Sequence, residues 1–279
     1  MHSRKIKLWG LAVLVLSLCV VALGLPPASD TTTEPKLTDE QMEDFLLHAK
    51  VIKSKQTSKG VTAPWRVTLS DGTITHDAVF QAIDERATMK KFDDGRTEMN
   101  FKDSYHFDIA GYRMAKMVGL DNMIPMYVER KWNGNSGAMG WWVPGVKFDE
   151  GERLKQHVNA PDIDAWNKQM YKIRVFDQLI YDTDRNLTNV LITDDWKIWR
   201  IDFTRAFRLF KTLRNPEDLV MCDKNLLDKI RKLDEDTILD ATKGQLSKGE
   251  VKAMMARRDT IVSTFDNLVA TKGAGAVLY

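Results

Sequence analysis

Residues 181–203 read YDTDRNLTNVLITDDWKIWRIDF, and this stretch decides the fold prediction. Two short runs with strand character, 190–192 and 197–201, flank an acidic turn, which is typical of a β-hairpin. When the two runs are paired around that turn, Asn189 faces Asp202 at the open end. The sequence therefore predicts that an amide oxygen and a carboxylate meet at one point.

A third polar side chain belongs to the same prediction. Asp184 lies on the preceding loop and can approach the open end of the hairpin. Phosphoryl transfer uses such groups, because a carboxylate orients the acceptor hydroxyl and takes its proton, while Asn and Asp oxygens hold Mg²⁺. The three residues indicate phosphoryl transfer. The alternative interpretation is an acidic turn on a solvated hairpin.

The segment resembles the catalytic loop and metal motif of atypical kinases: the phosphatidylinositol-kinase-like group, the HipA toxin kinases and the secretory-pathway kinases. These kinases carry an Asp-Arg-x-x-x-Asn loop, followed by a hairpin and an Ile-Asp pair. Here residues 184–189 read DRNLTN, and residues 201–202 read ID. The resemblance extends more faintly over residues 61–210.

The resemblance implies roles for individual residues. Asp184 would be the catalytic base, and Arg185 would brace the loop or contact phosphate. Asn189 and Asp202 would be the ligands of Mg²⁺ (or Mn²⁺), with ATP as the phosphate donor. Val143 would lie at the hinge between two lobes, where backbone groups could meet adenine.

The pattern along the chain predicts an α+β, bilobal protein-kinase-like fold. A small β-rich N-lobe is predicted at residues 61–143 and an α-rich C-lobe at residues 144–279. Asp103 is predicted to cap the helix of the N-lobe, and Gly119 to follow its end. The predicted strands are 61–69, 73–83, 124–132 and 139–143; the predicted helices are 38–53, 103–118, 166–181, 223–233 and 247–270; residues 90–97 are predicted as a loop.

The small-lobe part of the pattern departs from the kinases. Gln81 stands where the resemblance expects a phosphate-binding lysine, and Asp108 stands about where the helix would carry the partner Glu. A neutral amide supplies no positive charge to the α- and β-phosphates. Lys102, just before the helix, is the preferred substitute, with Lys90 and Lys91 as the others. If none of them substitutes, the chain is a pseudokinase.

Composition excludes some classes of protein. The chain has 279 residues, of which 41 are basic and 39 acidic, and its formal net charge is +2. This balance lacks the basic excess of a nucleic-acid binder, so no nucleic-acid partner is predicted. The five histidines and two cysteines form no cluster at zinc-ligand spacing. Hard cations held by Asp and Asn are therefore the predicted kind of metal.

The N-terminus has the pattern of a targeting segment. Basic residues among the first seven precede an apolar run at residues 8–25. This pattern predicts a signal peptide or short membrane anchor at residues 1–28, so the membrane is a predicted partner. Residues 29–60 are predicted as a linker and an N-terminal helix. The charge asymmetry across the run predicts an exported body, which is periplasmic, extracellular or membrane-anchored.

The predicted function is an ATP- and Mg²⁺-dependent phosphotransferase that acts on a protein Ser/Thr, lipid or small-molecule hydroxyl. The alternative, favoured by Gln81 and Asp108, is a catalytically impaired pseudokinase that is tethered to a membrane and binds nucleotide or a partner. A magnesium-dependent hydrolase is a weaker third hypothesis, because no nucleophile-activating motif supports it. Arg205 and Arg208 follow the metal motif and could meet an anionic substrate or form salt bridges.

Overall fold

The computed structural model describes residues 37–57, 63–184 and 186–279. The predicted signal peptide or anchor at residues 1–28 and the catalytic-loop residue Arg185 lie outside the described residues. Within the described ranges, no helix combines the length and the apolar character needed to cross a membrane.

A five-stranded antiparallel sheet dominates the first half of the chain, with the order β1-β2-β3-β7-β6. The helix α1 (Asp39–His48) packs on this sheet through the buried Phe45 and Leu46. Arg130 of β6 donates hydrogen bonds to the carbonyl oxygens of Leu46 and Ala49, at 2.8 and 2.7 Å. The strands are β1 (Lys50–Gln56), β2 (Trp65–Ser70), β3 (Thr75–Gln81), β6 (Tyr127–Trp132) and β7 (Asn135–Trp141).

The first helix is shorter than predicted. Its start agrees with the prediction, because Thr38 caps α1 in a capping box. The predicted continuation to Lys53 is wrong, since β1 begins two residues after the helix ends. Val51 is β-branched and pairs with Leu69 of β2, where such a side chain is favoured, and the pairing resumes at Lys53 after an irregularity at Ile52. The sheet therefore begins before the predicted lobe boundary at residue 61.

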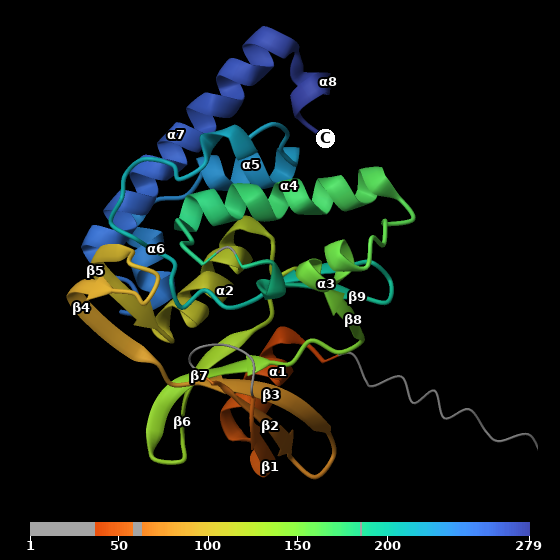
Figure 1. The fold of residues 1–279 in the computed structure, drawn as a ribbon, viewed down its shortest axis with the longest axis vertical. Coiled ribbons are helices and arrows are strands. Elements are labelled where there is room, and N and C mark those ends of the chain that lie inside the picture. Colours follow the sequence, from red (N-terminus) through yellow and green to blue (C-terminus); the bar gives the residue numbers. More distant parts are fainter. Residues whose placement is uncertain (1–36, 58–62, 185) are drawn as a thin grey trace, which may run out of the picture. The chain divides into compact units, whose positions relative to one another are not determined.

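The charged stretch before the second helix forms a hairpin. The strands β4 (Asp84–Lys91) and β5 (Thr97–Ser104) pair with each other in a separate two-stranded sheet. The predicted loop at residues 90–97 is too long: residues 92–96 form the turn, but Lys90, Lys91 and Thr97 are paired strand residues. Charged side chains on the exposed faces conceal the alternation in the sequence. Figure 1 shows this hairpin beside α6 and α7, away from the five-stranded sheet.

The helix α2 (His106–Val118) follows the hairpin and is buried along most of its length. Its predicted start at Asp103 is wrong, because Asp103 belongs to β5 and the residue before the helix is Tyr105. Its predicted end is confirmed. Gly119 takes the left-handed conformation there, with φ 76°, which glycine adopts without steric cost.

The hairpin that anchors the prediction is present, but its register differs by one residue. The strands β9 (Val190–Thr193) and β10 (Ile198–Arg200) pair so that Val190 faces Arg200. The prediction had Val190 facing Ile201. The cause is a three-residue loop whose last residue, Trp196, is left-handed with φ 62°, whereas the prediction assumed four loop residues. The strand β8 (Val146–Asp149) completes this sheet beside β9.

Helices make up most of the second half, as predicted. Capping aspartates precede α4, α5 and α6, and the predicted capping box of Ser247 and Glu250 opens α7. Figure 1 shows α4 running below α5 and α7, and α4 contacts α7 while α2 contacts α5 and α6. The elements are α3 (Glu150–Lys155), α4 (Ile163–Ile180), α5 (Lys224–Arg231), α6 (Glu235–Thr242), α7 (Lys248–Lys272), α8 (Ala274–Val277) and the 3₁₀ turns η1 (Leu187–Asn189) and η2 (Pro216–Asp218).

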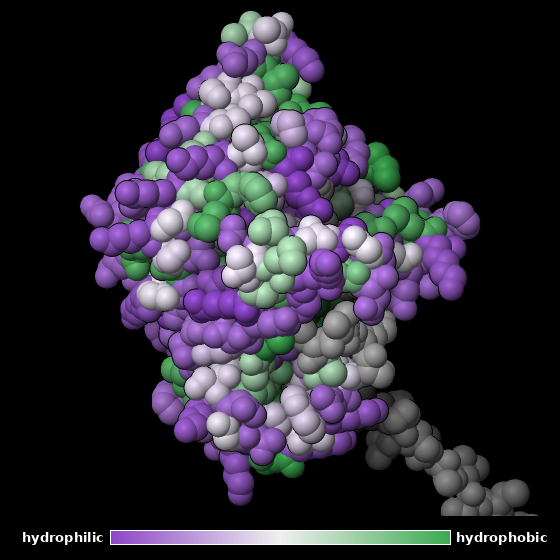
Figure 2. Space-filling model, turned by 60° about the vertical axis from the view of Figure 1, so that its left-hand side comes forward, coloured by the Kyte–Doolittle hydropathy of each residue, from purple (hydrophilic) through white to green (hydrophobic). Residues whose placement is uncertain are grey.

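One hydrophobic core runs through the sheet, α2 and the C-terminal helices. Figure 2 shows the surface of one side of the molecule, which is mainly hydrophilic with small, separated hydrophobic groups. The predicted α+β class is confirmed, with a β-rich first half and a helical second half.

Candidate active site

The end of α4 positions the catalytic loop. Tyr181 ends the helix in a left-handed conformation, with φ 51°. Asp182 then turns the chain, because its carboxylate accepts a hydrogen bond from the backbone N–H of Asp184 at 2.9 Å. Thr183 donates its hydroxyl to the carbonyl oxygen of Arg205 at 2.8 Å. The backbone at the predicted catalytic base is therefore fixed from both sides.

Arg200 at the end of β10 joins the parts of the site. Its side chain is 1% exposed and forms ion pairs with Asp182 and, at 3.5 Å, with Asp177. The same guanidinium donates to the carbonyl oxygens of Asp184 at 3.2 Å and of Asn189 at 3.4 Å. Burial alone would lower the pKa of Arg200, but the two carboxylates raise it. Arg200 is thus a permanent cation beneath the loop.

Asn189 ends the 3₁₀ turn η1 and is buried. Its carbonyl oxygen accepts from the N–H of Ile201 at 3.0 Å, so the corrected register still brings the loop to the end of β10. Its side-chain Nδ2 is buried and has no hydrogen-bond partner among the described residues. A buried amide nitrogen usually has a partner, so the surroundings of this side chain are incomplete without a further group.

Asp202 lies one residue beyond the hairpin and takes a left-handed backbone, with φ 61°. Thr204 donates its hydroxyl to Oδ1 of Asp202 at 3.0 Å. Burial, and then the nearby charge of Asp184, raise the pKa of Asp202. The structure therefore brings Asp184, Asn189 and Asp202 to one region, as predicted. Their roles in catalysis and metal binding stay predictions.

Asp108 reaches the same region from α2. It is 2% exposed, and its carboxylate accepts a hydrogen bond from the N–H of Phe203 at 2.7 Å. Burial, and then the charge of Asp202, raise its pKa well above the usual range. Asp108 therefore holds the backbone that follows Asp202.

The small-lobe sheet turns one face toward Asp202. Val79 of β3 pairs with Gly140, and Gly140 pairs with Tyr127, so their side-chain positions share this face. The Tyr127 hydroxyl contacts the backbone of Asp202. Gln81 is two residues beyond Val79 and belongs to the same face, where it is buried. Gln81, which stands where the resemblance expects the phosphate-binding lysine, thus lies on the face of the sheet that is turned toward Asp202.

Lys102, the predicted substitute cation, contacts a different element. Its ammonium group is 2.7 Å from a carboxylate oxygen of Glu250 at the start of α7, and both side chains are mostly buried. It also lies over the ring of Phe107 at 4.1 Å. A phosphate contact for Lys102 stays a prediction, and it would require this ion pair to open.

The hairpin β4–β5 also holds the segment that follows Asp202. Glu98 pairs with both Arg205 and Arg208, the latter at 2.6 Å. The N–H of Ser104 donates to the carbonyl oxygen of Thr204 at 2.9 Å. Of the two interpretations of Arg205 and Arg208, an anionic substrate or salt bridges, the structure shows salt bridges.

The predicted hinge, residues 143–145, lies between β7 and β8. Val143 is buried. Beyond it, the carbonyl oxygen of Gly145 accepts from the N–H of Asp194 at 3.1 Å, which ties the hinge to the β9–β10 turn. Its contact with adenine stays a prediction.

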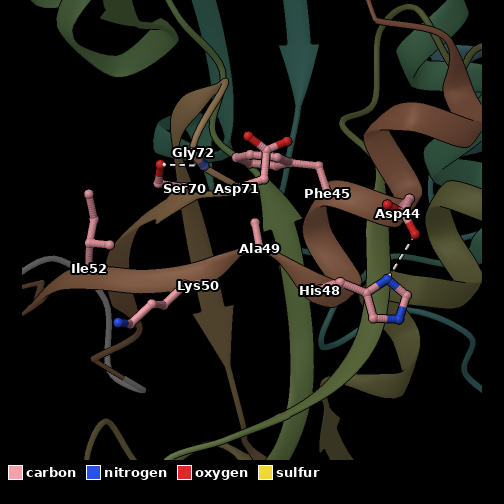
Figure 3. Close-up of a pocket in the computed structure, with 9 residues that line it drawn as sticks. All are labelled: Asp44, Phe45, His48, Ala49, Lys50, Ile52, Ser70, Asp71 and Gly72. Carbon is pink, nitrogen blue, oxygen red and sulfur yellow. Dashed lines mark hydrogen bonds and ion pairs between the residues drawn. The ribbon is translucent and has the colours of Figure 1, made fainter.

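A shallow hollow of about 570 Å³ lies elsewhere on the small lobe. Figure 3 shows it between the end of α1, the start of β1 and the β2–β3 turn, with Asp44 paired to His48 at its edge. Asp71 lies at the turn, where its carboxylate binds the N–H groups of Thr73 and Ile74. None of the predicted site residues lines this hollow.

The donor set fits a hard cation better than a transition metal. No three His, Cys, Asp or Glu side chains converge on a metal position in the part of the chain that the structure describes. One carboxylate, Asp202, and one amide, Asn189, supply oxygen donors. Mg²⁺ accepts few protein ligands, because it keeps water and substrate phosphates in its shell. The unpartnered atom of Asn189 is Nδ2, a hydrogen-bond donor, so the amide oxygen Oδ1 is the only atom of this side chain that could ligate a cation.

Sequence reasoning missed Arg200, Tyr127 and Thr204. A lone arginine in the short, otherwise apolar strand β10 was the available signal for the first. Tyr127 gave none, because its place depends on how β6 pairs with β7.

A twisted five-stranded sheet, a hinge and a helical lobe, with Asp184, Asn189 and Asp202 at their junction, define a protein-kinase-like fold. No family model matches the sequence, and no curated protein matches it either. Solved structures do match. A hydra Fam20, determined with a sugar, aligns with a TM-score of 0.63 at 13% identity, covering 86% of this chain and 91% of that one.

Two further solved structures match. A Golgi casein kinase aligns with a TM-score of 0.60 at 14% identity, covering 86% of this chain and 79% of that one. The Helicobacter pylori proinflammatory kinase CtkA gives a TM-score of 0.48 at 9% identity, with coverages of 82% and 98%. The matches to the hydra Fam20 and the Golgi casein kinase confirm the kinase-like fold. At 13% and 14% identity, structural similarity establishes the fold alone.

Proposed function

We propose that this chain is an ATP-dependent phosphotransferase that uses Mg²⁺ or Mn²⁺ and acts on a hydroxyl group. The acceptor belongs to a protein Ser/Thr, a lipid or a small molecule. One observation carries the proposal: Asp184, Asn189 and Asp202 meet at the end of the β9–β10 hairpin, with Arg200 bonded to the backbone of the first two.

Each residue has a chemical task in this proposal. The carboxylate of Asp184 accepts the proton of the acceptor hydroxyl as its oxygen bonds to the γ-phosphorus and ADP leaves. The oxygens of Asn189 and Asp202 hold the metal ion, which supplies positive charge to the triphosphate. Arg200 fixes the backbone at positions 184 and 189, so the base and the amide keep their separation.

The proposed location is outside the cytoplasm. The N-terminal pattern of basic residues followed by an apolar run supports export. A Golgi casein kinase among the matched folds is consistent with a secretory-pathway location. Membrane tethering through residues 1–28 is part of the same proposal.

A second candidate is a catalytically impaired pseudokinase that binds nucleotide or a partner. Gln81 favours it, because a neutral amide occupies the strand position where a cation was expected. The pairing of Lys102 with Glu250 also favours it, because the predicted substitute cation is already neutralised.

Thermal unfolding of the full-length chain with ATP and metal, alone and together, tests nucleotide binding. A ligand that binds only the folded state raises the melting temperature. We expect a rise that requires both ATP and metal and is abolished in Asp202→Ala. The matched control is Asp194→Asn, an exposed carboxylate in the turn of the same hairpin, which should behave like wild type.

Phosphate transfer from radiolabelled ATP then tests catalysis. Asp184→Asn should retain the ATP-dependent rise but transfer phosphate about 10²–10⁴-fold more slowly, which is the usual contribution of a general base. A wild-type chain that binds ATP and metal but transfers nothing to water, protein, lipid or sugar hydroxyls would favour the pseudokinase. No binding under any metal would contradict nucleotide-dependent function.

A further inference from the structure

Arg66 of β2 is held in a bracket between a carboxylate and an aromatic ring. Its guanidinium is 2.7 Å from Asp77 through Nε and 2.5 Å through Nη2. The hydroxyl of Thr68 donates to the other oxygen of Asp77 at 2.7 Å. The guanidinium carbon also lies 4.2 Å from the ring centre of Trp142, the residue before the predicted hinge.

Neighbouring contacts also fix Trp142, the residue before the predicted hinge. The N–H of Trp142 donates to the carbonyl oxygen of Asp77 at 3.1 Å. The ring Nε2 of His76 lies 3.0 Å from the carbonyl oxygen of Trp142. Asp77 and His76 of β3 thus bind both backbone polar groups of Trp142. These contacts fix the backbone that carries the indole next to Arg66.

The bracket lies on the face of the sheet that leads to Asp202. Arg66 pairs across the strands with Val79, and Val79 with Gly140, the partner of Tyr127. Side chains of directly opposed residues share a face. Tyr127 contacts the backbone of Asp202 from this face. Arg66 therefore lies beside Trp142 on the same face of the sheet from which Tyr127 contacts the backbone of Asp202.

We propose that the guanidinium of Arg66, stacked on Trp142 and oriented by Asp77, is the platform on which the nucleobase of the phosphate donor stacks. This inference rests on the proposed function, and it assigns the base-binding end of that site to a planar cation. Arginine planes stack on bases, and such contacts tolerate different bases because every base has a π-face.

The surroundings of Arg66 suit stacking better than phosphate binding. Burial alone would raise the pKa of Asp77, but the hydrogen bonds from Thr68 and Arg66 lower it, so Asp77 stays ionised and neutralises Arg66. A neutralised guanidinium attracts phosphate weakly, whereas its flat surface remains. The side chain of Arg66 is 49% exposed despite its contacts with Asp77 and Trp142, which leaves area for a further planar group.

The test compares three ligands on the full-length chain by isothermal titration calorimetry: ATP, adenosine and tripolyphosphate, each with Mg²⁺. In Arg66→Ala, binding of ATP and of adenosine should weaken about tenfold, the usual scale of a base stacking contact. Binding of tripolyphosphate should not change. Arg66→Lys keeps the charge beside Asp77 but removes the plane, so it should lose most of the same affinity.

The chain supplies a matched control. Arg96 also lies over an aromatic ring, Phe92 at 5.2 Å, and pairs with Asp94 at 2.6 Å, but on the tip of the β4–β5 hairpin. Arg96→Ala should leave all three affinities unchanged. Thermal unfolding of each variant without ligand establishes that the fold is kept.

The possible outcomes separate this inference from the proposed function. Equal ATP and adenosine affinities in wild type and Arg66→Ala would overturn the platform while leaving nucleotide binding intact. Tighter ATP binding in Arg66→Ala would also overturn it, because Arg66 would then cover the site. An equal loss for tripolyphosphate would make Arg66 a phosphate ligand instead. Failure of wild type to bind ATP would overturn both proposals.

Discussion

The two sides of the candidate site are built differently. On the large-lobe side, Asp184, Asn189 and Asp202 come from one continuous stretch and rest on the buried Arg200. On the small-lobe side, the residues come from β2, β3 and the hinge, and Arg66 remains half exposed. One side is a local motif with a buried cation beneath it, while the other is a surface assembled by strand pairing.

The difference also concerns charge. The large-lobe side carries closely spaced carboxylates: burial and then Asp184 raise the pKa of Asp202, and burial and then Asp202 raise the pKa of Asp108. On the small-lobe side, Arg66 is paired with Asp77, and Lys102 is paired with Glu250. The phosphate machinery is thus concentrated on the large lobe, and the small lobe offers mainly shape and neutralised pairs.

The largest expected effect is the loss of stability on removing Arg200, the buried cation of the large-lobe side. Arg200→Met should lower the free energy of unfolding by about 3–5 kcal/mol, because Asp182 and Asp177 would stay buried without their partner. Chemical denaturation measures this loss. The control is Arg231→Met, which breaks an exposed pair with Asp266 and should cost less than about 1 kcal/mol. Equal losses would remove the distinction between buried and surface pairing.

The next largest expected effect concerns the β4–β5 hairpin, which carries Glu98. Glu98→Gln should lower the free energy of unfolding by about 1–2 kcal/mol, because Arg205 and Arg208 share this one carboxylate as their ion-pair partner. Denaturation of wild type and variant at low and high salt should show the difference shrinking as salt screens the pairs. Glu85→Gln, which affects an exposed pair with Lys90, is the control. A loss no larger than that of the control would contradict a clamping role.

The large-lobe side could be predicted because it is local. The loop, the hairpin and the metal motif lie within residues 184–202, so strand pattern and motif spacing were enough to bring Asp184, Asn189 and Asp202 together. The one-residue error in the predicted register arose because Trp196 takes a left-handed backbone conformation in the loop. Turn rules expect residues such as glycine at left-handed positions, so a tryptophan gave no signal of this loop. The α+β class and most long helices followed from periodicity.

The small-lobe side could not be predicted in the same way. Arg66 and Trp142 are distant in sequence and meet because β2 pairs with β3 and β3 with β7. Residues 90–97 of the hairpin β4–β5 were predicted as a loop, and the strands were missed because their exposed faces are charged, which obscures the alternation that marks a strand. Lys102 was assigned from its position before α2, whereas its partner Glu250 comes from the far end of the chain.

A smaller effect tests whether the small-lobe side lacks only a charge. Gln81→Lys should tighten ATP binding about tenfold, equivalent to about 1.4 kcal/mol, because an ammonium group would face the phosphates. Gln81→Met, of similar length and uncharged, is the control, and calorimetry with ATP and Mg²⁺ gives both affinities. Unchanged or weaker binding in Gln81→Lys would show that the phosphates do not pass beside residue 81.

The smallest expected effect on nucleotide binding is at Lys102. Lys102→Met should lower the free energy of unfolding by about 1 kcal/mol, because it breaks the mostly buried pair with Glu250. The affinity for ATP should change by less than about threefold, or about 0.7 kcal/mol. Glu250→Gln separates two roles, because it frees Lys102 and retains a side-chain acceptor for the cap of α7. Tighter ATP binding in Glu250→Gln together with weaker binding in Lys102→Met would establish Lys102 as a phosphate ligand held in reserve by α7. If both variants lose stability alike and neither changes ATP affinity, Lys102 only fastens β5 to the large lobe, and positive charge for the phosphates must come from the metal ion.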